Sequence, residues 1–230
     1  MGSQKDSYKS LRIDHNYIAA DCSPRLPFGQ RQSVKRGTKI RDRDGILRIV
    51  TGWAAQQSIT GGAPRHLFSF LIPNDFLPES SAHYEVVALT DLVLLNFSGS
   101  ANDDAQTFIE AAKGRLFVHA ARLAAYGAYE RIADLFLELH ERLTAAGLAK
   151  GLRFPCPVGQ DQIGNMMGLS AVHVNRTIAK LRADGLLLSG PGWYALPDPE
   201  RLRQRIQTGS TAASYGEVFR GADRVGSAPT

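Results

Sequence analysis

Three polar side chains stand almost next to one another in the segment 170–181, which reads SAVHVNRTIAKL. His173, Asn175 and Arg176 carry hydrogen-bond donors, and the amide of Asn175 also carries an acceptor. The apolar residues of this part of the chain recur at helical spacing, at Leu169, Val174, Ile178 and Leu181. Because polar groups are costly to bury without partners, the three polar side chains are expected on the outer face of a helix. Their chemistry there would be recognition by hydrogen bonding.

The residues before this helix complete a helix-turn-helix pattern. A first helix is predicted over 160–167, and Gly168 suits the turn because glycine adopts positive φ at the lowest cost. Ser170 is a good N-cap for a second helix over 171–184. An ordinary helical hairpin inside a core would explain the apolar positions but not the unpaired polar ones. The pattern therefore favours DNA recognition.

Two positions of this pattern concern the packing between the helices. The small Gly164 falls where the two helices would cross, as the spacing requires. Thr177 occupies a position that is usually apolar, so Ile178 is expected to make that packing contact.

The composition permits an anionic partner. Lys and Arg number 27 against 22 Asp and Glu, which gives a net charge of +5 and a pI of about 9.4. No apolar run approaches the ~18 residues of a membrane span, so no membrane partner and a cytoplasmic location are expected.

No residue pattern indicates an enzyme or a cofactor. The sequence lacks the nucleophile-elbow, zinc-protease, phosphate-loop and dinucleotide-binding motifs. The two cysteines, Cys22 and Cys156, lie too far apart for a cluster and are expected to be reduced thiols. The histidines His66, His83 and His119 form no paired-ligand spacing, so neither a metal site nor a haem is expected.

The helix-turn-helix belongs to a chain of several parts. Short β-like runs separated by Gly, Pro and Asp, including a Gly61-Gly62 turn, predict a sandwich or roll over 25–100, after an N-terminal segment 1–24. A long helix is predicted over 101–128 and a second one over 129–144. After the recognition helix, LLLS and WYALP predict a two-stranded hairpin, which completes a winged unit over 129–207. The tail 208–230 is small, polar and aperiodic, and we expect it to be disordered.

The long helix carries apolar residues at alternating spacings of three and four, which is typical of a helix packed on another helix. This pattern predicts a homodimer seam. A histidine within the seam would lie near its symmetry mate, which raises the hypothesis of a response to pH or metal there. The predicted seam residues are Ile109, Ala112, Leu116, His119, Leu123 and Tyr126.

The segment QDQIGNMMGLSAVHVNRTIAKLRADGLL resembles the winged helix-turn-helix of the Crp/Fnr superfamily of bacterial transcription regulators, in its His-Val-Asn-Arg type. Upstream, ILRIVTGWAAQQSITGGAPRHLFSFLIPNDF is similar to the β-roll sensor domain of that family. The resemblance implies an α+β fold with an N-terminal jelly roll, a long dimerisation helix and a C-terminal winged helix-turn-helix. It also implies a dimer whose recognition helices enter successive major grooves of a near-palindromic operator.

The resemblance assigns base-reading positions in the recognition helix. Arg176 keeps the family pattern and suits guanine O6 and N7, whereas Asn175 stands where a Ser is common and suits adenine or a phosphate. Val172 replaces the usual Glu and is expected to contact a thymine methyl instead. Ser170 and His173 are expected at phosphates. Further candidate DNA contacts are Ala171, Lys180 and Gln160.

The expected partners are double-stranded DNA, a second copy of the chain and, for an activator, RNA polymerase. Two alternatives remain open from the sequence. One is a ligand-, haem- or pH-responsive regulator of the same fold. The other is a ligand-binding module that works through protein partners, with a merely structural helix-turn-helix.

The phosphate cassette of cyclic-nucleotide-binding relatives departs from its pattern in this chain. In FLPESSAHYEVVALTD, Glu79 is present, but Pro78 replaces a glycine and no arginine follows. No Lys or Arg occurs between Arg65 and Lys113, whereas seven acidic residues do: Asp75, Glu79, Glu85, Asp91, Asp103, Asp104 and Glu110. A phosphate would therefore meet a negative field.

We predict that cyclic AMP and cyclic GMP do not bind this protein at physiological concentration, because the arginine that would pair with the phosphate is missing. Isothermal titration calorimetry with each nucleotide tests this. A micromolar dissociation constant for either one would contradict the prediction.

Overall fold

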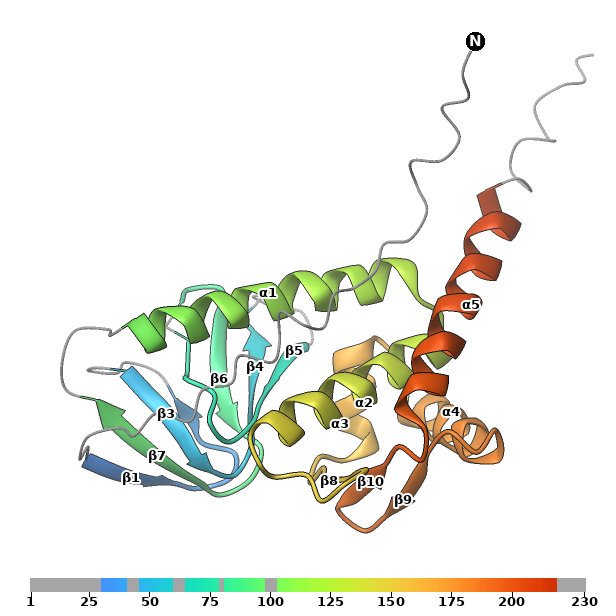
Figure 1. Cartoon of the computed structure of the whole chain (residues 1–230). Helices are drawn as coiled ribbons and strands as arrows, with labels where there is room; N and C mark the ends of the chain where they lie inside the picture. Colours follow the sequence, from blue (N-terminus) through green and yellow to red (C-terminus); the bar gives the residue numbers. More distant parts are fainter. Residues whose placement is uncertain (1–29, 41–45, 60–64, 79–80, 98–102, 219–230) are drawn as a thin grey trace, which may run out of the picture.

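The computed structural model describes residues 30–40, 46–59, 65–78, 81–97 and 103–218. They form a strand-rich unit, a long helix that runs along it, and a C-terminal unit of helices with a small sheet (Figure 1). The predicted Gly61-Gly62 turn, Cys22 and the N-terminal segment lie outside the described residues. None of the helices in these ranges combines the length and hydropathy that crossing a bilayer requires.

A glycine divides the β-like segment 46–59 into two strands. Gly52 has a φ of +88°, and a Cβ there would lie 2.1 Å from the carbonyl oxygen of Asp91. Only glycine fits this turn. As a result β3 (Ile46–Thr51) and β4 (Ala54–Ser58) belong to different sheets.

Two antiparallel sheets make up the strand-rich unit. In the first, β7 (Leu92–Phe97) pairs with β1 (Gln30–Val34) on one side and β3 on the other. The second has the order β2 (Lys39–Ile40), β6 (Tyr84–Ala88), β4 and β5 (Leu67–Leu71), so that β5 is an edge strand. Apolar side chains of both sheets form a common core that includes Val34, Leu47, Ile49, Leu71, Val86 and Leu94.

The helices α1 (Asp103–Ala125) and α2 (Ala128–Ala145) follow. The α1 helix lies along the strand-rich unit, and the chain then turns back at Tyr126 and Gly127 (Figure 1). Eight consecutive residues of α2, 132–139, are buried, because this helix is covered on several sides by its neighbours. The α+β class predicted from the sequence is confirmed.

The C-terminal unit contains α3 (Gln160–Met167), α4 (Ala171–Ala183) and α5 (Pro199–Val218). Its sheet has the order β8 (Arg153–Pro155), β10 (Trp193–Ala195) and β9 (Leu188–Gly190). The hairpin of β9 and β10 was predicted, whereas β8 was not. Pro155 argues against a central strand, but β8 is an edge strand, where proline is tolerated.

The expectation of a disordered tail from Thr208 is wrong for its first part. Helix α5 continues to Val218, past the boundary at residue 207 that the sequence suggested. The start of this helix is anchored, because Leu202 and Ile206 are buried. Residues 219–230 lie outside the described part of the chain.

Candidate nucleic-acid interface

Two local signals set the position of α4. Gly168 ends α3 with a φ of +68°, in the left-handed region that favours glycine. Ser170 caps α4, and its hydroxyl accepts a hydrogen bond from the backbone N–H of His173 at 3.2 Å. The sequence predicted both features, and it predicted the end of α4 to within one residue.

The inner face of α4 packs closely on α3. Val174, Thr177 and Ile178 are all buried, so the threonine lies inside together with its apolar neighbour. The close approach requires glycine at position 164, because a Cβ there would lie only 2.5 Å from the carbonyl oxygen of Leu169. The crossing point predicted from the sequence is therefore the one observed.

The outer face of α4 is open to solvent. The side chain of Val172 is 63% exposed. His173, Asn175 and Arg176 are exposed beside it. Within the described part of the chain, nothing bonds to the side chains of Asn175 and Arg176. This face can donate to and accept from a partner without breaking an internal contact.

The remaining candidate DNA contacts differ from one another in their surroundings. Ala171 is exposed at the start of α4, whereas Gln160 is half-buried at the start of α3. Lys180 is already engaged, because its ammonium lies 3.4 Å from the carboxylate of Asp184 and 5.7 Å from the ring centre of Tyr129. The structure thus gathers most of the predicted site on α4, where Lys180 follows Arg176 by one turn but is engaged by Asp184, while Gln160 lies on α3.

Tyr129 fixes the far end of α4, a role that the sequence did not reveal. Its hydroxyl, from the first turn of α2, donates to the carboxylate of Asp184 at 2.8 Å. The guanidinium of Arg205 in α5 lies 5.5 Å from the centre of the same ring. Burial, followed by the bond to Asp184, raises the pKa of Tyr129 well above its usual value, so the hydroxyl remains a donor.

Arg131 fastens the turn of the helix-turn-helix to the end of α1. It donates to the carbonyl oxygens of Leu123 at 2.8 Å and Tyr126 at 2.7 Å, and also to that of Met167 at 3.2 Å. These acceptors are backbone groups at two helix ends, which have no partner within their own helix. Sequence reasoning did not find this arginine, because backbone acceptors leave no trace in residue types.

The predicted dimer seam does not coincide with the exposed face of α1. Ala112, Leu116, Leu123 and Tyr126 are only half-buried, while the side chain of Ile109 is not described. Among the described side chains of α1, the large apolar residue that faces solvent is Phe117, at 77% exposure. Spacing alone identified the helix but not which of its sides faces its own strand-rich unit.

His119 faces the interior of its own chain rather than a symmetry mate. It is 7% exposed, and its Nδ1 has no hydrogen-bond partner. Burial, and then the charge of Arg122, lowers the pKa of His119 to about 4. The imidazole is therefore neutral near pH 7.

The described residues contain no group of three or more His, Cys, Asp or Glu placed to hold a metal ion. Cys156 is buried, and burial raises the pKa of its thiol to about 12, so the thiol stays protonated and unreactive.

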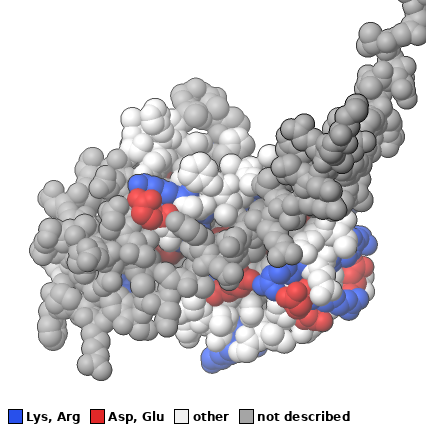
Figure 2. All heavy atoms as spheres, turned by 45° about the horizontal axis from the view of Figure 1, so that its top comes forward, with Lys and Arg blue, Asp and Glu red and all other residues white. Residues whose placement is uncertain are grey.

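The acidic run of the strand-rich unit is not left uncompensated, as the sequence had suggested. Three of its carboxylates pair with cations from other segments: Asp75 with Arg115 and Arg142, Glu85 with Lys39 and Arg65, and Asp91 with Lys35. These cations are already engaged by carboxylates. On the face shown in Figure 2, basic and acidic side chains likewise lie next to one another.

Comparisons with known proteins place this geometry in a family context. Residues 130–205 match the Crp-like helix-turn-helix domain. The chain is 25% identical over 177 residues to the transcriptional activator protein FnrL of Cereibacter sphaeroides, with 69% of this chain and 71% of that protein covered.

Solved structures share the fold over most of their length. FixK2 from Bradyrhizobium japonicum matches with a TM-score of 0.63 and 21% identity, over 77% of this chain and 97% of that one. A CRP/FNR-family transcriptional regulator from Thermus thermophilus matches with a TM-score of 0.57 and 20% identity, over 78% of this chain and 98% of that one. The chain therefore has the fold of Crp/Fnr regulators and carries a Crp-like helix-turn-helix domain.

The buried His119 predicts a component of acid sensitivity. The folded pKa of about 4 lies below the usual 6.5, so the neutral form is favoured in the fold. The contribution of His119 to the free energy of unfolding is complete above about pH 6.5 and is lost as the pH falls toward 4. Between these two values, unfolding takes up as much as one additional proton at His119. In His119→Gln this component should disappear, as measured by chemical denaturation between pH 7 and 4. Equal pH slopes for the two proteins would show that His119 does not titrate in this way.

Proposed function

We propose that this chain is a homodimeric transcription regulator that reads a near-palindromic DNA operator through α4, with a strand-rich unit that does not bind cyclic AMP. The observation that carries the proposal is the outer face of α4, where an exposed valine stands among polar side chains without internal partners. The match to the Crp-like helix-turn-helix domain and the similarity to regulators rather than enzymes support it.

The side chains of this face suit different parts of a DNA duplex. The planar fork of Arg176 fits guanine O6 and N7, and Asn175 fits adenine or a phosphate. Val172 supplies an apolar surface for a thymine methyl group. Ser170 and His173 stand at the start of α4, where backbone N–H groups and the positive helix end favour phosphate. Base contacts would set the sequence, and phosphate contacts would set the affinity.

The exposed face of α1 is the surface through which we expect two copies of the chain to associate. Its solvent-facing side presents Phe117 between small residues, with Ala120 and Ala124 exposed one turn and two turns further on. Such a surface allows two helices to approach closely around an aromatic anchor. For such a dimer to read a near-palindromic operator, its two copies of α4 have to lie about 34 Å apart, which is one turn of DNA.

The base-reading role predicts a specific loss in Arg176→Ala. If Arg176 pairs with one guanine in each half-site, the variant loses about 1–3 kcal/mol of binding free energy per half-site and relaxes the preference at that base pair. Binding-site selection from random DNA, followed by titration on the selected operator, measures both effects.

Two further variants are matched controls for Arg176. His173→Ala should weaken binding to all sequences about equally, because a phosphate contact carries no sequence information. Val172→Glu introduces an acceptor for cytosine N4 and should shift the selected base toward cytosine. If the selected motif is the same with and without Arg176, the assignment of contacts along α4 is wrong.

The dimer proposal predicts that Phe117→Glu dissociates the protein. Because Phe117 is 77% exposed in the single chain, its replacement should not disturb the protomer, but a buried aromatic anchor at an interface is worth about 2 kcal/mol or more. Sedimentation velocity should report monomers for Phe117→Glu and dimers for the conservative control Phe117→Leu. Leu116→Asp, at the centre of the seam predicted from the sequence, is half-buried and should also destabilise the protomer. A tight dimer in Phe117→Glu would place the interface elsewhere.

A further inference from the structure

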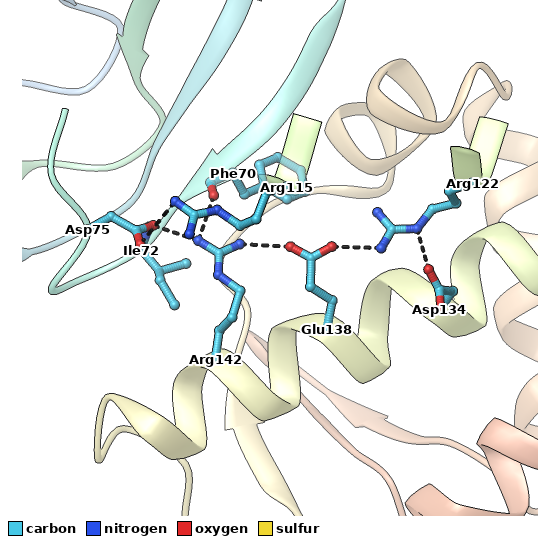
Figure 3. A network of polar contacts seen from close by, with 8 residues as sticks. All are labelled: Phe70, Ile72, Asp75, Arg115, Arg122, Asp134, Glu138 and Arg142. Atoms are coloured by element: carbon cyan, nitrogen blue, oxygen red, sulfur yellow. Dashed lines mark hydrogen bonds and ion pairs between the residues drawn. The ribbon is translucent and has the colours of Figure 1, made fainter. Parts of the chain in front are cut away.

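A chain of six alternating charges runs through the interior between the strand-rich unit, α1 and α2 (Figure 3). Arg115 and Arg142 both bond to the carboxylate of Asp75, at 3.4 and 2.5 Å. On its other side Arg142 bonds to Glu138 at 3.0 Å. The chain of charges continues from Glu138 to Arg122 and from Arg122 to Asp134, each at 2.6 Å.

All six side chains are buried, and each charge has an opposite neighbour. Burial alone would raise the pKa of Glu138, but Arg122 and Arg142 on either side hold it at about 2. The carboxylate is thus ionised throughout the physiological range. An internal charge that loses its partner is far more costly than one at the surface, so the six residues act as a unit.

Asp75 is the only side chain of the strand-rich unit in this charge chain. Its carboxylate also accepts the backbone N–H of Ile72 at 2.8 Å, which fixes it within its own turn. Arg142 completes the contact by donating to the carbonyl oxygen of Phe70 at 3.0 Å. Arg142 belongs to the helix-turn-helix domain that spans residues 130–205, so this is a bond between the two units.

A second contact joins the two units through α3. The amide oxygen of Asn165 accepts the backbone N–H of Leu67 at 2.6 Å, and its amide nitrogen donates to the carbonyl oxygen of Arg65 at 3.0 Å. Leu67 begins the edge strand β5, whose outer side pairs with no other described strand. The side chain of Asn165 therefore pairs with backbone groups at the start of this strand.

Between the two polar contacts the apolar core is continuous. Trp53, Leu67 and Phe70 of the strand-rich unit share one cluster with Ile132 and Met166 of the C-terminal unit. Because α4 is packed on α3, and α3 is held on β5, the direction of α4 depends on these contacts.

We propose that Asp75 and Asn165 are positioning residues for DNA reading: they lock the winged helix-turn-helix onto its own strand-rich unit with the outer face of α4 uncovered, so that no ligand is needed to orient it. The inference rests on the proposed function and extends it to regulation. The internal charge chain would hold the winged helix-turn-helix in the orientation that binds DNA. Without such contacts, a bound effector would have to stabilise that orientation.

Asp75→Asn tests the lock, because it keeps the shape of the side chain and removes its charge. Binding is measured on the operator selected by the native protein and on a library in which the spacing between half-sites varies. If the competent orientation falls to about a tenth of the population, affinity drops about tenfold, and the preference for one spacing broadens. Asn165→Ala, which removes the other contact, should act in the same direction.

Two controls separate orientation from stability. The double variant Asp75→Asn/Arg115→Gln restores the balance of internal charges, so it should regain thermal stability, yet it still lacks the ion pair between position 75 and Arg142. Its broadened spacing preference should persist.

Glu141→Gln removes a 2.6 Å ion pair to Arg203 that lies wholly within the C-terminal unit, and it should leave the spacing preference unchanged.

A measurement without DNA tests the contact between the two units independently of the proposed function. Amide hydrogen exchange of Leu67, whose N–H is held by Asn165, should accelerate in Asp75→Asn and Asn165→Ala but not in Glu141→Gln. If the native protein selected no DNA sequence, the proposed function would fail while this exchange still tested the lock. Native spacing preference and native exchange in Asp75→Asn would overturn the inference, as would recovery of both in the double variant.

Discussion

The interior ion chain around Arg142 is the constraint on which the rest of the structure depends. Arginine cannot shed its charge by deprotonation, so a buried guanidinium has to be met by carboxylates or carbonyl oxygens. The guanidinium of Arg142 donates to acceptors from two units. Asp75 and the carbonyl oxygen of Phe70 belong to the strand-rich unit, and Glu138 belongs to the same helix as Arg142. Once α2 carries this arginine on its inner face, the strand-rich unit has to lie where Asp75 can reach it.

The apolar core follows the same geometry. With α2 held against the turn after β5, its buried residues share one apolar cluster with Phe70 and Trp53 and with buried residues of α3 and α4. The C-terminal unit is therefore not joined to the rest of the protein by a simple hinge. Arg131 of α2 donates to backbone carbonyls at the end of α1 and at the end of α3. It thereby ties the turn before α4 to both α1 and α2.

How much of this was predictable depends on how local each cause is. The bounds of α3 and α4 follow from Gly168 and Ser170, which act on their immediate neighbours, and the sequence predicted both helices almost to the residue. The partners of Asp75 are 40 and 67 residues away, so the sequence suggested only an uncompensated acidic run. Strand β8 was missed because its position at a sheet edge, which makes Pro155 acceptable, is a tertiary property. The buried side of α1 was missed for a related reason, since it carries Arg115, His119 and Arg122, and the carboxylates that make burial of the two arginines possible lie on other elements.

Two arginines of this chain have opposite surroundings. Arg142 is surrounded by acceptors, whereas Arg176 extends from α4 with no bond to any residue that the structure describes. The helix ends differ in the same way. The first turns of α2, α3 and α5 each carry an acidic residue, which balances the positive end of the helix, but the first turn of α4 carries none. At α4 both the helix end and the arginine are left without a negative group of their own, and an anionic partner is the natural source of that charge.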